Sequence, residues 1–478
     1  VVRILDAIKT IDRNTLIWDD IDVAPPQKNG KIKWATEFGM SPENDNNYEQ
    51  LMAAINYCKE NQIYKLIVPK GIYRFTTPDR IRLKDMEDFI LDCQGSEFIF
   101  SGDLPQRAAN QAHYMDISGC KRVEVRDVTL DWDWDSGRLS SLAVLKNVDD
   151  LTMDMEFPEV EYMKESDLIF HCLDIYDLEG NTWGSSVPGE TVTAYNQSFT
   201  VNERINDNTF RVTCNNTSYR GTFKEGQAYL IRHYEYEFHG LVVNTSEDIT
   251  IDGMNIYSAA GHSYCFGSGS TRWQMLNCTA KIRPGSNRYI ASNTDGMHCG
   301  SPGGSYKLEN CEISQMGDDC TNIYRYLTNE YTRNKEKKNA IDINFDTWRF
   351  PLQVGEVIEF RYSDMYSTGV TATVTRVDDF GTGYYVEFSE DLPDIITDNM
   401  VLRNLSYSAE HYIIRNCKFI SNKVRGSLLH EGYALIEGNT WEDNGRSNLL
   451  ITNGIGRWSE GFDMDNVILR NNVFKCCS

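Results

Sequence analysis

Short alternating runs of hydrophobic residues, each interrupted by a pair of small polar residues, recur along the chain. An apolar residue precedes the pair, which is most often Asn-Cys, Asn-Asn or Gly-Asn, and alternation then resumes. Period-two alternation broken by a small residue that turns the chain predicts a short strand with a corner. The copies are VRDVTL (125–130), IDGMNI (251–256), MLNCTA (275–280), LENCEI (308–313), IRNCKF (414–419), IEGNTW (436–441) and LRNNVF (469–474).

The spacing of these copies predicts the coils of a parallel β-helix. Where copies are contiguous, the intervals are 24, 33, 22 and 33 residues, which are too long for hairpin strands. Residues one coil apart then lie on neighbouring strands. We therefore expect an interior ladder in which each side chain is satisfied by the coils above and below it. Its members are Cys278, Cys311, Cys417, Asn439 and Asn472.

Three other patterns complete the predicted fold. In residues 47–61, Leu51, Ala54, Ile55 and Cys58 recur at helical spacing, which predicts an amphipathic helix that covers the first coil. Longer alternating runs separated by Gly, Asp and Asn turns interrupt the repeat twice and predict two small inserted antiparallel β-barrels.

The predicted fold class is all-β, a parallel β-helix with an N-terminal capping helix and the two insertions. The expected organisation is a cap and first coils (1–139), a barrel (140–232), central coils with the catalytic site (233–325), a second barrel (326–408) and C-terminal coils (409–478).

The net charge and the cysteine content limit the classes of partner and cofactor that the chain is expected to bind. The net charge of −23 disfavours nucleic acid, pectate and anionic membranes, so a neutral oligosaccharide or glycoconjugate fits better. The 13 cysteines form no CxxC pair, so neither a zinc ribbon nor a disulfide scaffold is indicated. We expect no cofactor. No apolar run is long enough for a membrane span. The first residues, VVRILDAIKT, contain no signal core, and we expect an exported protein whose signal is absent from this chain. A homodimer stays open, as does continuation beyond Ser478.

Two acidic motifs lie about one coil apart. Asp295 in SNTDGMHC (292–299) precedes Asp318 and Asp319 in MGDDCTNIY (316–324) by 23 and 24 residues. Neighbouring strands are about 4.8 Å apart, so the three carboxylates should meet, with Gly317 providing a corner that points both later side chains outward. Mutual repulsion should raise the pKa of at least one, as an acid for glycosidic cleavage requires. The alternative is that these residues only form turns.

These motifs resemble those of β-helix glycoside hydrolases. NTD followed by GDD is similar to glycoside hydrolase family 28, the polygalacturonase type, but its Gly-His-Gly and Arg-Ile-Lys motifs are missing. The chain resembles glycoside hydrolase family 110, the β-helix α-1,3-galactosidases, more closely. That resemblance covers about 231–474 and rests on RHYEYEFHGLVV (232–243), IYSAAGHSYCF (256–266), IRPG (282–285), TDGMHC (294–299), MGDDCTNIY (316–324), NKVRGSLLHEGYALIEGNTWED (422–443) and RWSEGFDMDNVILRNNVF (457–474).

The resemblance implies a right-handed β-helix and exo-acting, inverting, metal-free removal of terminal α-1,3-linked galactose from blood-group-B-type or related glycans. Asp318 would be the general acid, and Asp319 and Asp295 would orient and deprotonate the water. Tyr324 stands where the family has His, which leaves the exact sugar open. Other terminal-sugar hydrolysis, polygalacturonase-like hydrolysis and non-catalytic glycan binding remain alternatives.

Further residues are assigned to substrate binding, and several have structural alternatives. His262 and His298 could equally be hydrogen-bonded structural residues, Arg283 could lie in a solvated turn, and Trp458 could plug the end of the solenoid. The assigned residues are His262, Arg283, His298, Asn322, Arg425, Trp458 and Glu460.

Overall fold

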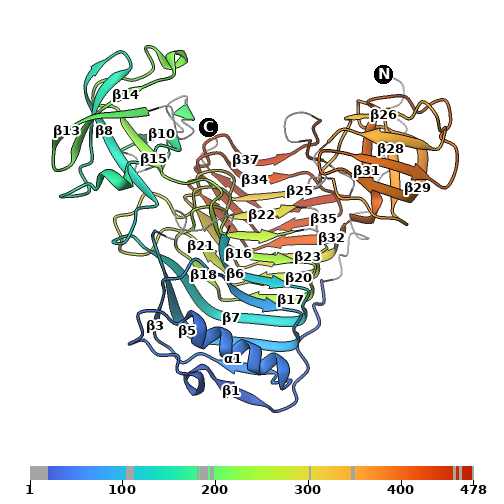
Figure 1. Ribbon diagram of the computed structural model, residues 1–478, viewed down its shortest axis with the longest axis horizontal. Coiled ribbons are helices and arrows are strands. Elements are labelled where there is room, and N and C mark those ends of the chain that lie inside the picture. The colour runs from blue at the N-terminus through green and yellow to red at the C-terminus, as the bar shows by residue number, and fades with distance from the viewer. Residues whose placement is uncertain are drawn as a thin grey trace.

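The computed structural model describes residues 20–103, 112–179, 182–183, 192–193, 199–267, 269–300, 303–345, 350–407, 409–455, 459–461 and 466–475. Strands stack in parallel from the N-terminal end to the C-terminal end, as the repeat predicted, and two antiparallel lobes flank the late coils (Figure 1). The chain is therefore mainly β-structure, and its central body is a parallel β-helix.

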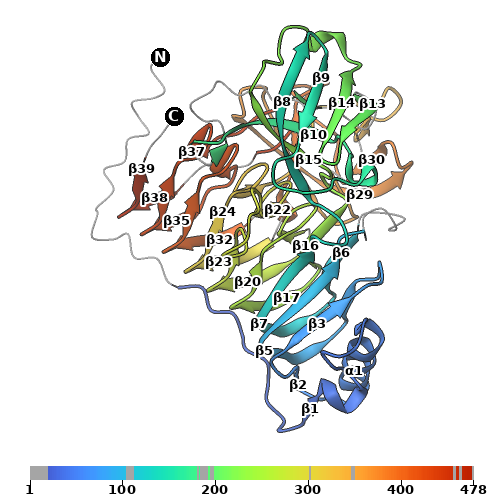
Figure 2. The ribbon, with the colours of Figure 1, turned by 90° about the vertical axis from the view of Figure 1, so that its left-hand side faces the viewer.

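In the described part of the chain, the largest sheet has 17 strands, all paired in parallel, and runs along the length of the stack (Figure 2). We call it the long sheet. Its strands are β1 (Ile32–Trp34), β2 (Lys65–Ile67), β3 (Ile72–Phe75), β5 (Glu87–Ser101), β7 (Lys121–Asp133), β17 (Glu247–Asp252), β18 (Asn255–Ile256), β20 (Thr271–Leu276), β21 (Thr279–Ala280), β23 (Gly303–Glu309), β24 (Glu312–Ser314), β32 (Ala409–Arg415), β33 (Lys418–Ile420), β35 (Ala434–Glu437), β36 (Thr440–Glu442), β38 (Val467–Arg470) and β39 (Val473–Lys475).

A second parallel sheet of eight strands forms another wall, which we call the site sheet. Its register confirms the coil length, because Met297 pairs with Thr321, 24 residues later. Its strands are β4 (Ile81–Lys84), β6 (Ala112–Ser118), β16 (Phe238–Asn244), β19 (Tyr264–Phe266), β22 (Met297–Gly300), β25 (Thr321–Tyr324), β34 (Arg425–Leu429) and β37 (Ser447–Ile451).

The two members of each small polar pair have different structural roles at the corners of the long sheet. The first member adopts a left-handed backbone, with φ of 54° at Asn277 and 56° at Asn310, a conformation that Asn tolerates better than most residues. The second member points inward: Asn439 Nδ2 donates to the Ile414 carbonyl at 2.8 Å, and the Asn439 amide donates to Asn472 Oδ1 at 2.9 Å. The predicted ladder is confirmed.

The predicted helix is present as α1 (Tyr48–Glu60), and its buried residues are Leu51, Ala54, Ile55 and Cys58, as the spacing required. It lies beside the first strands at the N-terminal end of the stack (Figure 1). That position fits the predicted cap, which stays an interpretation.

Two antiparallel sheets occupy the predicted insertions, and their closure into barrels stays a prediction. The first antiparallel sheet contains β8 (Ser140–Asp149), β9 (Thr152–Glu156), β10 (Cys172–Asp177), β11 (Thr182–Trp183), β12 (Val192–Thr193), β13 (Phe199–Asn206), β14 (Thr209–Cys214) and β15 (Ala228–Arg232). The second antiparallel sheet contains β26 (Tyr331–Arg333), β27 (Ala340–Ile343), β28 (Val357–Arg361), β29 (Ser367–Asp379), β30 (Tyr384–Phe388) and β31 (Val401–Asn404).

Candidate active site

The acidic motifs meet where two successive coils of the site sheet begin. Ser292 forms a parallel bridge with Met316, and β22 then pairs with β25. One carboxylate oxygen from each of Asp295, Asp318 and Asp319 lies within 4.8 Å of the others. The coil spacing therefore brings the three side chains together, as the sequence predicted. We call them the aspartate trio.

Gly317 makes this approach sterically feasible. A Cβ at this position would lie 2.3 Å from the Asn293 carbonyl oxygen and 3.0 Å from Arg232 Cδ. The chain bends at this glycine instead of continuing as a strand, so strict alternation of side chains does not apply. The corner expected from the sequence is present.

Asp295 and Asp319 each accept hydrogen bonds that hold their carboxylates in place. Asp295 Oδ2 accepts from His298 Nδ1 at 2.6 Å, and Asp295 Oδ1 accepts from the Asp319 amide at 3.1 Å. The two oxygens of Asp319 accept from Arg425 Nη1 at 3.2 and 3.0 Å, and the Arg425 amide donates to Oδ1 at 3.0 Å. These hydrogen bonds fix the orientation of both carboxyl groups.

Asp318 is half-buried, whereas the other two are buried. Burial and repulsion from Asp295 raise the pKa of Asp318 to about 6, against opposing attraction from Lys423, Arg232 and Arg425. Burial and the other two carboxylates also raise the pKa of Asp319. Burial and mutual repulsion therefore favour a shared proton on this pair, and Asp318 is the more exposed of the two.

Both assigned histidines contact Asp295, one through its side chain and the other through its backbone. Burial opposes charge on His298, but its hydrogen bond to Asp295 raises its pKa overall, and Nε2 lies 2.8 Å from the Tyr324 hydroxyl. Burial and repulsion from His298 and His239 lower the pKa of His262 well below its usual value. Its neutral Nδ1 accepts from the Asp295 amide at 3.1 Å, and the rings of His262 and His298 stack 4.1 Å apart.

We expect His298→Asn to lower kcat by about 10-fold or more with a smaller change in KM, because Asp295 loses a charged donor and its fixed orientation. The measurement is steady-state kinetics on the substrate proposed below. His411→Asn is the matched control, since that ring lies 3.2 Å from the Ser305 hydroxyl on the long sheet. An equal loss in both variants would show that His298 has no specific role.

The other assigned residues divide into two groups. Arg425 contacts Asp319, Asn322 lies in register with His298 on the neighbouring strand, and Glu460 Oε2 lies 3.5 Å from His430 Nε2. Arg283 is placed elsewhere: it forms ion pairs with Asp131 at 2.8 Å and Glu97 at 2.6 Å, so its guanidinium is committed to other carboxylates and does not orient the trio. Trp458 lies outside the described residues.

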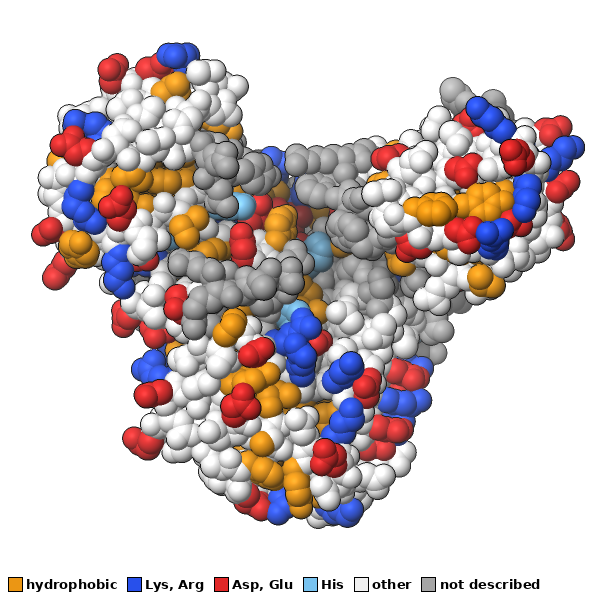
Figure 3. All heavy atoms as spheres, viewed as in Figure 1, with side chains coloured by type: hydrophobic (Ala, Val, Ile, Leu, Met, Phe, Trp, Pro, Cys, Tyr) orange, Lys and Arg blue, Asp and Glu red, His pale blue; other side chains and the backbone are white. Residues whose placement is uncertain are grey.

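Sequence reasoning missed cations that come from the insertion and from a later coil. Arg232, at the end of β15, and Lys423, after β33, both face Asp318. Both residues lie far from the acidic motifs in the sequence and at no regular interval from them. No sequence pattern therefore indicated that they interact with Asp318. The face that carries the two lobes is hollowed between them, and histidine and acidic side chains are visible there (Figure 3).

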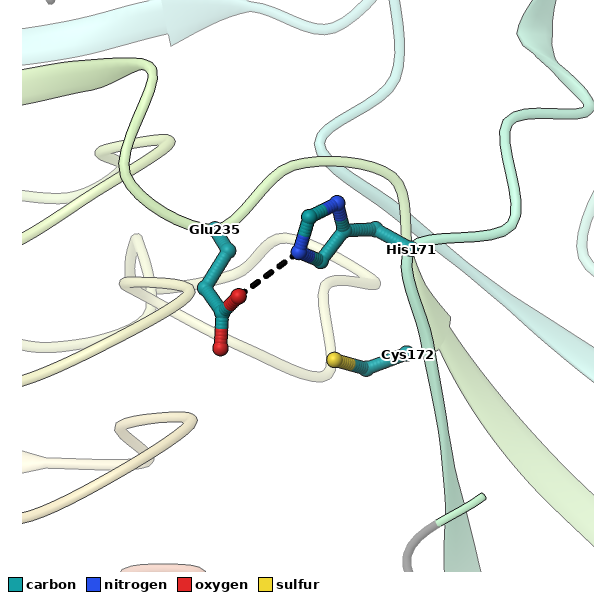
Figure 4. Close-up of side chains that lie close together, drawn as sticks. All are labelled: His171, Cys172 and Glu235. Carbon is teal, nitrogen blue, oxygen red and sulfur yellow. Dashed lines mark hydrogen bonds and ion pairs between the residues drawn. The ribbon is translucent and has the colours of Figure 1, made fainter. Parts of the chain in front are cut away.

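Among the described residues, three groups of side chains have the composition of metal ligands: the aspartate trio, the set of His262, Asp295 and His298, and the set of His171, Cys172 and Glu235. In the trio the Arg425 guanidinium already neutralises Asp319, and in the second set His262 Nδ1 already accepts hydrogen bonds. In the third, His171 Nε2 and Glu235 Oε2 are joined at 2.7 Å, as Figure 4 shows.

Comparisons with known proteins identify relatives that match most of the chain. No protein-family model matches. The chain is 22% identical over 491 residues to α-1,3-galactosidase B of Bacteroides thetaiotaomicron, covering 93% of this chain and 75% of the relative. It is also 22% identical over 486 residues to α-1,3-galactosidase A of Shewanella woodyi, covering 93% and 76%. An exopolygalacturonase structure from Thermotoga maritima aligns with 89% of this chain and 69% of its own at 12% identity and a TM-score of 0.40, too low to support a conclusion.

Proposed function

We propose that this chain, a glycoside hydrolase related to α-1,3-galactosidases, removes terminal α-1,3-linked galactose from oligosaccharides or glycoconjugates in an exo-acting, inverting reaction. The observation that carries the proposal is the aspartate trio, in which one half-buried carboxyl has a pKa of about 6 beside two hydrogen-bonded carboxylates. Protonated acid and ionised base side by side are what cleavage of a glycosidic bond requires.

Each member of the trio has a role in the proposed reaction. Asp318 protonates the glycosidic oxygen as the bond to galactose breaks. Asp319, held by Arg425, and Asp295, held by His298, orient a water molecule and take its proton as it attacks the anomeric carbon. Positive charge develops on the sugar ring in the transition state, and the two anions stabilise it. Asn322 and Glu460 would bind hydroxyl groups of galactose.

The stereochemical outcome needs its own test. Inverting enzymes typically separate their two carboxyl groups by about 6.5–9.5 Å and retaining enzymes by about 5–5.5 Å. The trio has oxygens within 4.8 Å of one another, so inversion rests on the resemblance and not on this spacing. Proton NMR of the first galactose released identifies its anomer. Release of β-galactose supports inversion, and release of α-galactose overturns it.

The substrate is tested by release of free galactose from an α-1,3-linked digalactoside. The control substrates are the α-1,4- and β-1,3-linked digalactosides and a digalacturonide. Galactose released only from the α-1,3 linkage supports the proposal. Cleavage of the digalacturonide alone would support the polygalacturonase-like alternative, and no cleavage of any of them would contradict both.

Turnover should fall as the pH rises through about 6. The pKa of Asp318 is raised in the folded protein, so the acid is protonated below that value and progressively lost above it. On the basic limb of the pH profile, above the pKa of Asp318, we expect kcat/KM to fall with a slope that approaches tenfold per pH unit. A pH profile of galactose release measures it, and a flat profile between pH 6 and 8 would show that Asp318 is not the titrating acid.

A further inference from the structure

A buried ion-pair group from the first antiparallel sheet lies behind the aspartate trio. Asp174, on β10, accepts from Arg232 Nε at 2.8 Å through Oδ2, and its Oδ1 lies 2.6 Å from Lys423 Nζ. The side chains of Asp174 and Arg232 are only 2% and 4% exposed. One carboxylate therefore holds two cations that come from separate parts of the chain.

Both residues also hydrogen-bond the backbone that carries the trio, Arg232 through its guanidinium and Lys423 through its main-chain amide. Arg232 Nη1 donates to the Asn293 carbonyl at 2.5 Å, two residues before Asp295. The Lys423 amide donates to the Met316 carbonyl at 3.2 Å, two residues before Asp318. The segment that precedes Asp295 is thus bonded to Arg232, and the segment that precedes Asp318 is bonded to Lys423. Asp174 binds the side chains of both residues.

The charges of Arg232 and Lys423 also act on the trio. Arg232 and Lys423 both attract the ionised form of Asp318, as Arg425 does, while Asp295 and Asp319 repel it.

Glu235, which hydrogen-bonds His171 beside Cys172 (Figure 4), and Cys172 itself also lie within electrostatic range of Arg232 and Lys423. Tyr236 also lies within electrostatic range of Asp318. Asp174 and Glu235 together balance Arg232 and Lys423, so the loss of either anion leaves a net positive charge facing the acid.

We propose that Asp174 is a positioning residue for hydrolysis, which acts through Arg232 and Lys423 to hold the backbone of the aspartate trio and to limit the positive charge that Asp318 meets. This inference rests on the proposed function, since it assigns Asp174 a part in the same reaction. It gives the inserted sheet a role in the chemistry although Asp174 is not itself a member of the trio.

The test is the pH profile of galactose release by Asp174→Asn. Without the carboxylate, two cations face Asp318 with less compensation and favour its ionised form. The basic limb should therefore move to lower pH, by about half a unit or more for a charge lost in a poorly solvated site. Lys423→Met should move the same limb to higher pH, because it removes one cation. The double variant should return towards the wild-type profile.

Three controls keep the test decisive. Asp154→Asn removes another carboxylate of the same sheet, one that accepts from Arg211 Nε at 2.8 Å, and should leave the profile unchanged. Asp174→Glu should restore most of the wild-type limb. Shifts of the two single variants in the same direction, or no shift in either, would overturn the proposal. If Asp174→Asn does not fold, the direction of the shift in Lys423→Met decides alone.

A measurement without substrate separates this inference from the proposed function. Carbon-13 NMR of protein labelled at the aspartate carboxyl carbons follows the titration of Asp318, whose signal is identified by its loss in Asp318→Asn. If the wild type releases no galactose, the proposed function fails. The opposite shifts of the Asp318 carboxyl in Asp174→Asn and Lys423→Met would still support the inferred role, and identical titrations would overturn it.

Discussion

Asp318→Asn is expected to lower kcat for the α-1,3-linked digalactoside by about 10²–10⁴-fold, the usual worth of a positioned general acid. The carboxamide has nearly the same shape but cannot deliver a proton to the leaving oxygen. Since Asp318 is half-buried, its replacement should leave the fold intact, which circular dichroism and the melting temperature check. Asp342→Asn is the control, because Asp342 lies on β27 and accepts from Asn334 at 2.9 Å.

The leaving group identifies which step is lost. The phenol of an aryl galactoside with a strongly acidic phenol leaves with little protonation. Asp318→Asn should therefore be far less impaired on the aryl galactoside than on the digalactoside. Asp295→Asn and Asp319→Asn should lose turnover on both substrates, because activation of water is needed in either case. A uniform loss in Asp318→Asn on both substrates would remove it from the role of acid.

Gly317→Ala is expected to lower kcat by about 10²-fold, since even about 1 Å of misplacement can have such an effect. The new Cβ would lie 2.3 Å from the Asn293 carbonyl oxygen, and backbone must move to relieve this contact. That movement separates the segment of Asp318 from the segment of Asp295. Kinetics on the digalactoside measure the effect.

Gly303→Ala is the matched control for this glycine. Its added Cβ meets nothing closer than the Ser270 carbonyl oxygen at 4.0 Å, so turnover should stay close to that of the wild type. If Gly317→Ala keeps full activity while its melting temperature is unchanged, the close approach of the two coils is not needed for catalysis.

Much of the helical stack could be read from local patterns. Asn277 and Asn310 occupy left-handed corners, and Cys278 and Cys311 point inward after them, because backbone conformation and side-chain polarity act within a few residues. The predicted length of one coil then placed Asp295 beside Asp319 without any coordinates. Helix α1 followed from its apolar spacing in the same way.

The partners of the site residues could not be read from the sequence. Arg283 precedes the acidic coil in sequence, yet it binds Glu97 and Asp131, which come from much earlier coils. The hydrogen bonds of the His298 ring to Asp295 and Tyr324 likewise appear only in the structure.

The sequence by itself determined the parallel coils, their inward ladder and the meeting of three aspartates, because each depends on a periodic pattern along the chain. Only the tertiary structure decided which cations act on the trio. Arg232, Lys423 and Arg425 come from separate segments, and a charge acts through space at distances that sequence separation does not report.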